Sequence, residues 1–213
     1  MSERTLSLTA AQLRLLALTL MLVDHVGRTM YPEQVWMVCL GRLAFPIFAF
    51  QTAEGYRHTR NFRRYCLRLA VFTLVSEVPF NLMAGGALLY PGHQNVMFTM
   101  LLGLLCCRAW DSRNWGQLAL WLLASMLGFP DYGMLGVATV LVFHIFREDL
   151  LTLALLFACI HCFGYGFPSI QSFAVLAWLP ISRYTGEKGR GGRWLQYGSY
   201  LFYPAHMLIL GLL

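Results

Sequence analysis

The chain has 213 residues, of which 58% are hydrophobic and 12% charged, and its formal net charge is +6. Its mean hydropathy is +0.56. About a quarter of the residues of a soluble domain are charged, so this composition excludes an ordinary soluble fold and predicts a polytopic membrane protein. Apolar segments follow one another almost from end to end. We therefore expect a single all-α integral membrane domain over residues 1–213, a bundle of transmembrane helices in a lipid bilayer.

The apolar segments predict the number of spans, because a membrane-spanning helix needs about 20 mostly apolar residues. Nine segments qualify: 10–28, 35–55, 67–84, 95–110, 116–130, 132–147, 149–166, 170–181 and 195–213. Residues 170–181 are short for a full crossing, so a bundle of eight spans is the alternative.

The basic residues predict an orientation, because Lys and Arg favour cytoplasmic loops close to the membrane. They gather after the second, fourth, sixth and eighth spans: Arg57, Arg60, Arg63, Arg64 and Arg68; Arg108 and Arg113; Arg147; Arg183, Lys188, Arg190 and Arg193. These loops share one side, so we expect a cytoplasmic N-terminus. Arg28 and Arg42 fall elsewhere, which makes them functional candidates. The positive charge is thereby assigned to orientation in the membrane, not to nucleic-acid binding.

The end of the first span carries ionisable residues inside the bilayer. Asp24, His25 and Arg28 directly follow an apolar run, although a charged side chain in a membrane helix costs about 2.5–3.5 kcal/mol on insertion scales and is usually functional. The helical rise of about 1.5 Å per residue places further ionisable groups near the depth of Asp24, about 6–10 Å inside the outer ends of their spans. These groups are Arg42, Glu77 and His206, and the helix-bending residues Pro46, Pro79 and Pro204 lie close to them. The sequence therefore predicts a polar site in the outer half of the membrane.

Two explanations of this polar site remain open from the residues alone. Asp24 or Glu77 paired with Arg42 would simply lock the bundle, with His206 as a hydrogen-bonded core residue. In the second explanation, a carboxylate beside an imidazole makes the histidine a general base or a transient nucleophile, and an arginine stabilises an oxyanion. Such parts suit acyl transfer, and they equally suit proton-coupled transport. Histidines away from this depth are interpreted as structural or solvated: His58, His93 and His144.

The six cysteines lie inside or beside apolar segments, at positions 39, 66, 106, 107, 159 and 162. Cys159 and Cys162 form a C-x-x-C pair with His161 between them, but a zinc site normally needs four ligands and the second pair is missing. We therefore interpret the cysteines as small buried hydrophobic residues and expect no metal.

Short motifs run through most of the chain in a specific order. They are Met21-x-x-Asp24-His25-x-Gly27, Gly41-Arg42-Leu43-Ala44-Phe45-Pro46, Glu54-Gly55-Tyr56, Ser76-Glu77-x-Pro79-Phe80, Asn95-Val96, Asp131-Tyr132-Gly133, Tyr184-Thr185-Gly186 and Phe202-Tyr203-Pro204-x-His206. In combination they resemble the TraX family, which includes a conjugation-plasmid protein that acetylates the N-terminus of pilin. The family's usual Tyr-Asn-Gly reads Tyr184-Thr185-Gly186 here.

The resemblance implies a multi-pass acetyltransferase of the bacterial inner membrane that moves an acetyl group from acetyl-CoA to an acceptor peptide, such as a pilin N-terminus, or to a cell-envelope glycan. By position, the residues that the resemblance carries over are Asp24, His25, Arg42, Glu54, Glu77, Asn81, Asn95, Tyr203 and His206. We assign Asp24, His25, Arg42 and Glu77 to catalysis, and Asn81, Asn95, Tyr203 and His206 to substrate binding. We expect His25 to act as base or acyl carrier with Asp24 orienting it, Arg42 and Glu77 to shape and neutralise the site, and His206 to lie on the acceptor side. A proton-coupled transporter or channel is the alternative function.

The donor acetyl-CoA is expected to arrive from the cytoplasm. Its anionic phosphates would favour the basic loops, where glycines let backbone amides approach a phosphate. The expected cofactor-binding residues are Arg57, Arg64 and Arg190, with Glu54 along the path of the pantetheine arm. Orientation in the membrane explains the same arginines without any ligand.

Overall fold

The structure is a computed structural model, and it describes residues 7–128 and 130–213, except for the side chain of Arg193. Within these residues the chain is helical apart from its loops and two isolated β-bridges, Leu8 with Tyr184 and Gln94 with Pro130. The helices are α1 (Ala10–Met30), α2 (Val35–Gly41), α3 (Ala44–His58), α4 (Phe62–Gly85), α5 (Val96–Asp111), α6 (Trp115–Leu127), α7 (Gly133–Ile145), α8 (Leu150–Cys159), α9 (Trp178–Ile181) and α10 (Gly192–Leu212). The all-α class is confirmed.

Each predicted span corresponds to helical structure. The fifth, residues 116–130, includes Phe129, which lies outside the described residues, and α6 ends at Leu127. The seventh continues α8 into a π-helical turn, Ile160–Gly164, and the eighth is the 3-10 helix Ile170–Ala177 followed by α9. Within the part of the chain that the structure describes, three helical segments are long and apolar enough to cross a membrane: Ala10–Met30, Val35–His58 and Phe62–Gly85. The count of nine spans and the cytoplasmic N-terminus stay predictions.

The second predicted span is divided at Arg42 and Leu43, between α2 and α3. Pro46 gives the physical reason, because its ring lacks an N–H group and clashes with the carbonyl four residues earlier, which is that of Arg42. The helix therefore restarts after Arg42. In α4 and α10, by contrast, Pro79 and Pro204 lie inside helices that continue past them.

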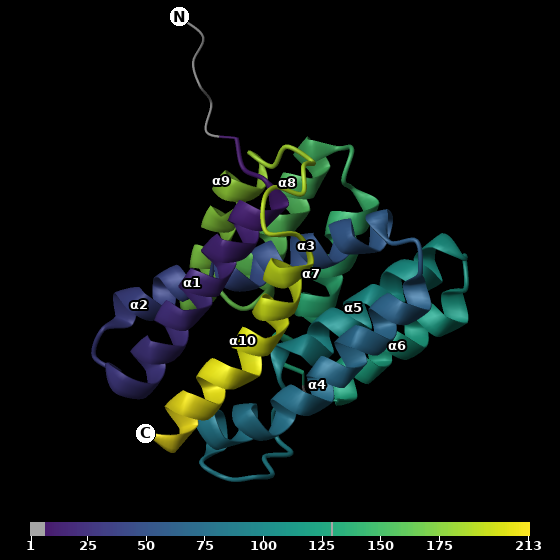
Figure 1. Cartoon of the computed structure of the whole chain (residues 1–213). Helices are drawn as coiled ribbons and strands as arrows, with labels where there is room; N and C mark the ends of the chain where they lie inside the picture. The colour runs from purple at the N-terminus through teal and green to yellow at the C-terminus, as the bar shows by residue number, and fades with distance from the viewer. Residues whose placement is uncertain (1–6, 129) are drawn as a thin grey trace, which may run out of the picture.

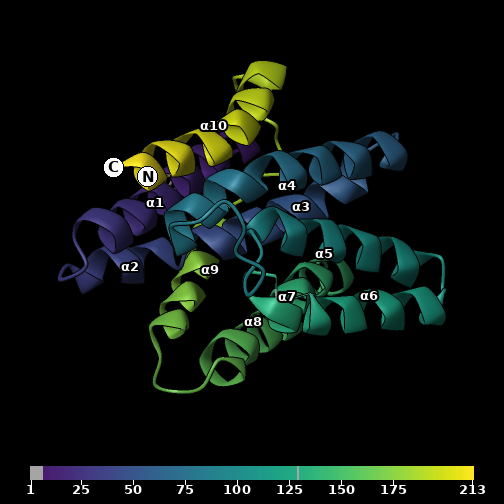
Figure 2. The same ribbon diagram turned by 90° about the horizontal axis from the view of Figure 1, so that it is seen from below.

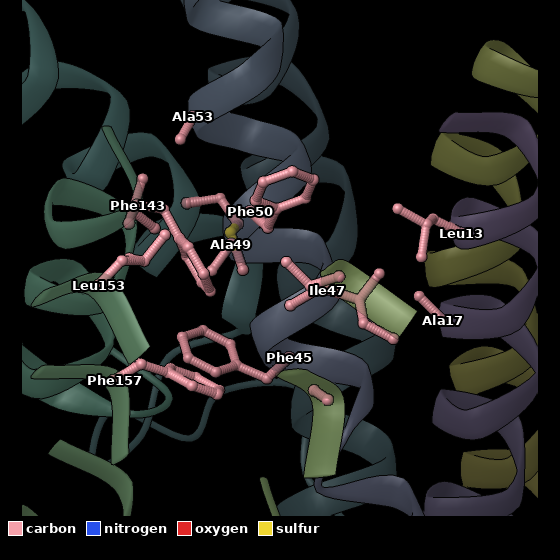
Figure 3. Close-up of a cluster of buried hydrophobic side chains, with 14 of the residues drawn as sticks. Leu13, Ala17, Phe45, Ile47, Ala49, Phe50, Ala53, Phe143, Leu153 and Phe157 are labelled. Atoms are coloured by element: carbon pink, nitrogen blue, oxygen red, sulfur yellow. The ribbon is translucent and has the colours of Figure 1, made fainter. Parts of the chain in front are cut away.

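Helix α3 lies at the centre of the bundle. Figure 3 shows Phe45 and Phe50 of α3 pointing toward Phe143 and Phe157 of α7 and α8, while Leu13 and Ala17 of α1 lie on the other side of α3. Figures 1 and 2 both show α10 beside α4 and α5 beside α6, in agreement with the packing of these pairs. Helices α1, α3, α4, α5 and α10 thus surround the space in which the polar residues meet.

Candidate functional site

A cavity of about 320 Å³, here called the polar cavity, lies where the C-terminal ends of α1 and α4 meet the start of α3 and the middle of α10. Its ionisable lining residues are Asp24, His25, Arg28, Arg42, His93, Asp131, Tyr132 and Tyr203. Apolar side chains such as Phe45, Phe48 and Phe80 complete the wall. The chain therefore brings residues from six separate segments to one polar enclosure.

Asp24 is buried, with 6% of its surface exposed, and it is held by two arginines. Its Oδ1 accepts a hydrogen bond from Nη2 of Arg42 at 2.6 Å, and its Oδ2 lies 2.9 Å from Nε of Arg28. Helices α1 and α2 approach closely here, since a Cβ at Gly41 would overlap the side chain of Asp24. Arg28, a functional candidate from the sequence like Arg42, shares the carboxylate with Arg42 and lines the cavity.

His25 pairs with a second histidine. Its Nδ1 lies 2.7 Å from Nε2 of His206, and the two ring planes are 8° apart. Nδ1 of His206 lies 2.7 Å from the carbonyl oxygen of Phe202, to which it donates, so a neutral His206 must accept at Nε2. His25 then donates through Nδ1 and keeps the lone pair on its own Nε2, an assignment that follows from the hydrogen-bond chain. That nitrogen has no hydrogen-bond partner among the described residues.

The expected pairing of Asp24 with His25 is wrong. Asp24 bonds to the two arginines, and the partner that orients His25 is His206. His206 itself is not among the residues that line the polar cavity, so its contribution passes through His25. Consecutive residues of a helix point about 100° apart, which separates the two side chains although they share a depth.

Three further predicted residues join α4 to the loop and helix that follow it. Nδ2 of Asn95 donates to Oε2 of Glu77 at 2.6 Å and to the carbonyl of Thr73 at 3.0 Å, while Oδ1 of Asn95 caps α5. Asn81 donates to the carbonyl of Leu88 at 3.1 Å. None of the three lines the polar cavity, and the described contacts include no bond between Glu77 and Arg42.

Tyr203, also predicted, does line the polar cavity. Its hydroxyl oxygen accepts a hydrogen bond from the backbone N–H of Val96 at 3.3 Å. The residue is buried, with 5% of its surface exposed. It therefore ties α10 to the start of α5 at the wall of the cavity.

A histidine and a carboxylate that the depth argument missed stand in the same cavity. Nε2 of His93 lies 3.2 Å from Oδ1 of Asp131. The backbone N–H of Asp131 donates to Gln94 at 2.8 Å, and its carbonyl accepts from the hydroxyl of Thr99. The hydrogen bond to Asp131 raises the pKa of His93 above its ordinary value. Both residues lie in loops, so a depth estimated along the predicted spans could not place them. The Asp131-Tyr132-Gly133 motif was the feature of the sequence that indicated this segment.

Tyr132 shapes the wall between these groups. It has a positive φ of 68°, in the left-handed region that a side chain seldom adopts. Its ring packs against Phe45 with centroids 3.8 Å apart, and the guanidinium of Arg42 lies 5.9 Å from the ring centroid. Tyr132 thereby connects Arg42 to the segment that carries Asp131.

A second cavity of about 320 Å³, here called the basic cavity, lies at the other end of α1. Among its lining residues are Arg14, Glu54, His58, Lys188, Gly189 and Arg190. Glu54 is buried and accepts a hydrogen bond from Nε of Arg147 at 2.9 Å. Of the predicted cofactor residues, Glu54 and Arg190 thus line the same cavity. Arg57 instead bonds to Glu148 beside a different depression, and Arg64 is exposed and lines neither space.

A small cavity of about 80 Å³, here called the connecting cavity, lies between the other two. It shares Met21, Phe48, Val96 and Tyr203 with the polar cavity, and Arg14 and Gln51 with the basic cavity. Arg14 has no hydrogen-bond or ion-pair partner within residues 7–128 and 130–213.

His161, beside the two cysteines of the C-x-x-C pair, is fully buried and lies within hydrogen-bond distance of Thr139 and Gln171. Cys159 and Cys162 are free thiols. Among the described residues, no three His, Cys, Asp or Glu side chains are grouped as ligands of a metal ion.

Comparison with known proteins covers nearly the whole chain. The family model described as TraX protein matches residues 9–213. The chain is similar to a probable fimbrial assembly protein, FimC of serogroup H1, of Dichelobacter nodosus, at 28% identity over 98% of this chain and 96% of that protein. It is also similar to Protein TraX of Escherichia coli strain K12, at 26% identity over 94% of this chain and 85% of that protein. No solved structure matches the chain.

Proposed function

The chain belongs to the TraX family, and on this premise we propose that it is a multi-pass acetyltransferase of the bacterial inner membrane. It transfers an acetyl group from acetyl-CoA to an acceptor of the cell surface, either a peptide N-terminus such as that of pilin or a cell-envelope glycan. The name of the Dichelobacter relative, a probable fimbrial assembly protein, fits a pilus-associated role.

The observation that carries this proposal is the unpartnered Nε2 of His25, held beside Arg42 in the polar cavity. A neutral imidazole whose tautomer is fixed by a second histidine is a general base at neutral pH. Arg42 is permanently charged, and its buried Nε has no hydrogen-bond partner among the described residues. In this mechanism His25 accepts a proton from the attacking acceptor, and Arg42 stabilises the oxyanion that forms as the thioester carbonyl is attacked.

The basic cavity supplies a site for the donor's phosphates. Arg14, Lys188 and Arg190 line it, and the 21-residue helix α10 begins beside them at Gly192. Cationic side chains and the N-terminal end of a long helix both favour an anionic group. Because basic residues predict the cytoplasmic side, this end of α1 would face the compartment that contains acetyl-CoA.

The distance between the two cavities suits the reach of the donor. Arg14 and Asp24 are ten residues apart in α1, and a helix rises about 15 Å over that length. The pantetheine arm has about twelve chain atoms, as many as about four extended residues, which span about 14 Å. The connecting cavity lies along this line, so movement of its shared side chains would open a path for the thioester.

The proposal is tested with the full-length protein in lipid nanodiscs, by transfer of radiolabelled acetyl from acetyl-CoA to a peptide with a free N-terminus and to an oligosaccharide. We expect His25→Gln to lose about 10²–10⁴-fold in rate, the usual contribution of a general base. His144→Gln is the matched control, because His144 pairs with Asp111 at 2.8 Å outside the polar cavity. Wild-type protein that neither binds acetyl-CoA nor transfers acetyl to any acceptor would overturn the proposal.

A second experiment, in sealed vesicles, distinguishes acetyl transfer from proton-coupled transport, which the row of cavities along α1 also suits. In a transporter, the protein in sealed vesicles would carry protons with a substrate, and acetyl transfer would be absent. If His25 carries the acetyl group covalently, acetylated protein would accumulate when the acceptor is withheld, and the variant His25→Gln would not become acetylated.

A further inference from the structure

His161 is a buried polar residue that the mechanism above leaves unused. It has 0% of its surface exposed, it lies in the π-helical turn Ile160–Gly164, and it does not line the polar cavity. Burying a polar group costs free energy unless the group is hydrogen-bonded, and π-helical turns occur frequently at functional sites. The partners of its two ring nitrogens therefore indicate what the residue does.

The hydrogen bonds around His161 run in one direction. The hydroxyl of Thr139 donates to the carbonyl of Leu135 at 2.8 Å, so its oxygen accepts from Nε2–H of His161 at 3.3 Å. Nδ1 of a neutral His161 is then an acceptor, and Nε2 of Gln171 donates to it at 3.2 Å. The tautomer and the orientation of the amide are assigned from this network. The ring thereby determines which end of the Gln171 amide points away from it.

The other end of the Gln171 amide meets Arg42. Because the NH₂ group is turned toward His161, the oxygen Oε1 accepts from Nη1 of Arg42, at 3.5 Å. The other terminal nitrogen of the guanidinium, Nη2, donates to Asp24 at 2.6 Å. A guanidinium is planar, so bonds at both Nη atoms fix its plane as well as its position. A reversed amide would turn its NH₂ group toward a cation that has no acceptor to offer.

A second set of contacts joins His161 to Tyr132, the neighbour of Arg42 in the cavity wall. The ring of His161 stacks on Tyr165, with centroids 5.7 Å apart and planes 21° apart. The hydroxyl of Tyr165 donates to the carbonyl of Tyr132 at 2.9 Å. The guanidinium of Arg42 in turn lies 5.9 Å from the centroid of the Tyr132 ring. Residues 161–171 thus support two adjacent residues of the polar cavity.

We propose that His161 and Gln171 are positioning residues for acetyl transfer. His161 orients the amide of Gln171, and Gln171 together with Asp24 clamps the guanidinium of Arg42 in the orientation in which its remaining N–H groups bind the oxyanion. This inference rests on the proposed function, and it adds two residues that do not line the polar cavity themselves. The histidine of the C-x-x-C segment thereby acts through Arg42.

Arg42 needs such support because of its place in the chain. It directly follows α2, where the helix is interrupted before α3 begins, and its long side chain has many rotamers. Oxyanion stabilisation depends on donors that are already oriented when the charge develops, and a misplacement of about 1 Å can cost about 10²-fold in rate. The clamp supplies partners from two other elements, Asp24 from α1 and Gln171 from the 3-10 helix Ile170–Ala177.

The experiment compares two variants that remove a similar volume from His161. Asparagine carries its oxygen on Cγ, where the histidine ring carries Nδ1, so His161→Asn keeps an acceptor for Gln171, whereas His161→Leu removes it. Acetyl transfer is measured in nanodiscs with the acceptor that the wild-type protein acetylates, and kcat is expressed per acetyl-CoA site counted by equilibrium binding. We expect His161→Leu to lose about 10-fold to 10²-fold in kcat, with KM for acetyl-CoA nearly unchanged, and His161→Asn to retain most of the wild-type kcat.

Gln171→Leu tests the route from His161 to Arg42. It removes the clamp directly, so the double variant His161→Leu with Gln171→Leu should be no slower than Gln171→Leu alone, because residues that act as a unit are not additive. His144→Leu is the matched control, since His144 has a side chain 11% exposed and pairs with Asp111 outside the polar cavity; its kcat per site should not change. Losses that multiply in the double variant, or an equal loss in His161→Asn and His161→Leu, would overturn the inference.

A measurement on Arg42 itself separates this inference from the proposed function. Bonds at both Nη atoms slow the rotation about the Nε–Cζ bond, so in ¹⁵N NMR of arginine-labelled protein the two Nη signals of Arg42 should exchange slowly. We expect slow exchange in the wild type and in His161→Asn, and faster exchange in His161→Leu and Gln171→Leu; Arg42→Lys assigns the signals. Exchange at one rate in all four proteins would overturn the clamp. Slow exchange without acetyl transfer by the wild type would instead overturn the proposed function, and the catalytic role of the clamp with it.

Discussion

The two ends of α1 present their charges in opposite ways. At the C-terminal end, Asp24 is 6% exposed and bonded to arginines inside a cavity with apolar walls. At the N-terminal end, Lys188 and Arg190 are exposed around a loop with several glycines of positive φ. Buried, paired charges are fixed in position, which suits chemistry, whereas exposed cations adapt to an anionic ligand and are screened by salt. One helix therefore joins a rigid site to an adaptable one.

The largest effect should come from breaking the rigid end. Asp24→Ala leaves the guanidinium of Arg42, with a side chain only 11% exposed, without its carboxylate. Removing one partner of a buried ion pair costs about 3–5 kcal/mol, and the half-exposed Arg28 adds little. Reversible unfolding in mixed micelles measures this loss. Glu148→Ala, which removes the 84% exposed partner of Arg57, should cost less than about 1 kcal/mol. Similar losses for the two variants would contradict the contrast between buried and exposed charges.

A smaller effect is expected where α2 meets α1. Gly41→Ala would place a methyl group against the side chain of Asp24 and push Arg42 away from it. Overpacking of this kind costs about 1–3 kcal/mol, and acetyl transfer should fall with it. Gly116→Ala in α6 is the control, because its new methyl group would find its nearest atom at 3.7 Å. If the two variants unfold alike, Gly41 does not set the approach of the helices.

At the N-terminal end of α1, a substitution in the basic cavity is expected to weaken the binding of acetyl-CoA. Arg190→Ala should raise KM for acetyl-CoA by about tenfold, equivalent to about 1.4 kcal/mol, and leave kcat nearly unchanged because the reacting atoms are far away. Steady-state kinetics at low and high salt measure both constants, and the loss should shrink at high salt. Arg64→Ala, exposed and outside the basic cavity, should change neither. An equal effect at Arg64 would restore the prediction made from the sequence.

The smallest effect concerns stability and pH. The pKa of His93 is raised in the folded protein, so the stabilisation by its pair with Asp131 is fully present below the ordinary value of about 6.5 and is lost as pH rises through the folded value. The pair is more than a third exposed on the histidine side, and its worth is below about 1 kcal/mol. Unfolding of wild type and His93→Gln should differ at pH 6 and converge at alkaline pH. A difference that grows with pH would reverse the sign of this linkage.

The apolar segments predict the helices because burial in lipid acts on whole segments of the chain. Of the groups that helical rise placed at one depth, Asp24 and Arg42 line one cavity together with His25, whereas Glu77 and His206 do not line it. The side-chain pairs could not be predicted in this way, because depth in the membrane does not determine how a residue is rotated about its helix axis. His25 points toward His206, and Glu77 points toward Asn95. His93 and Asp131 come from loops, whose positions depend on tertiary contacts such as the bond between Asp131 and Gln94.

The side chains shared by the polar and connecting cavities would also limit the passage of ions through the protein. Met21, Phe48 and Tyr203 stand between the two spaces, with Phe48 and Met21 presenting apolar surface. An energised membrane exerts about 2.3 kcal/mol on each elementary charge per 100 mV, and a row of cavities across it would be a route for ion leakage. Under the proposed function these shared residues would form an electrical seal, and any opening that admits a thioester would have to close around it tightly enough to keep the membrane insulating.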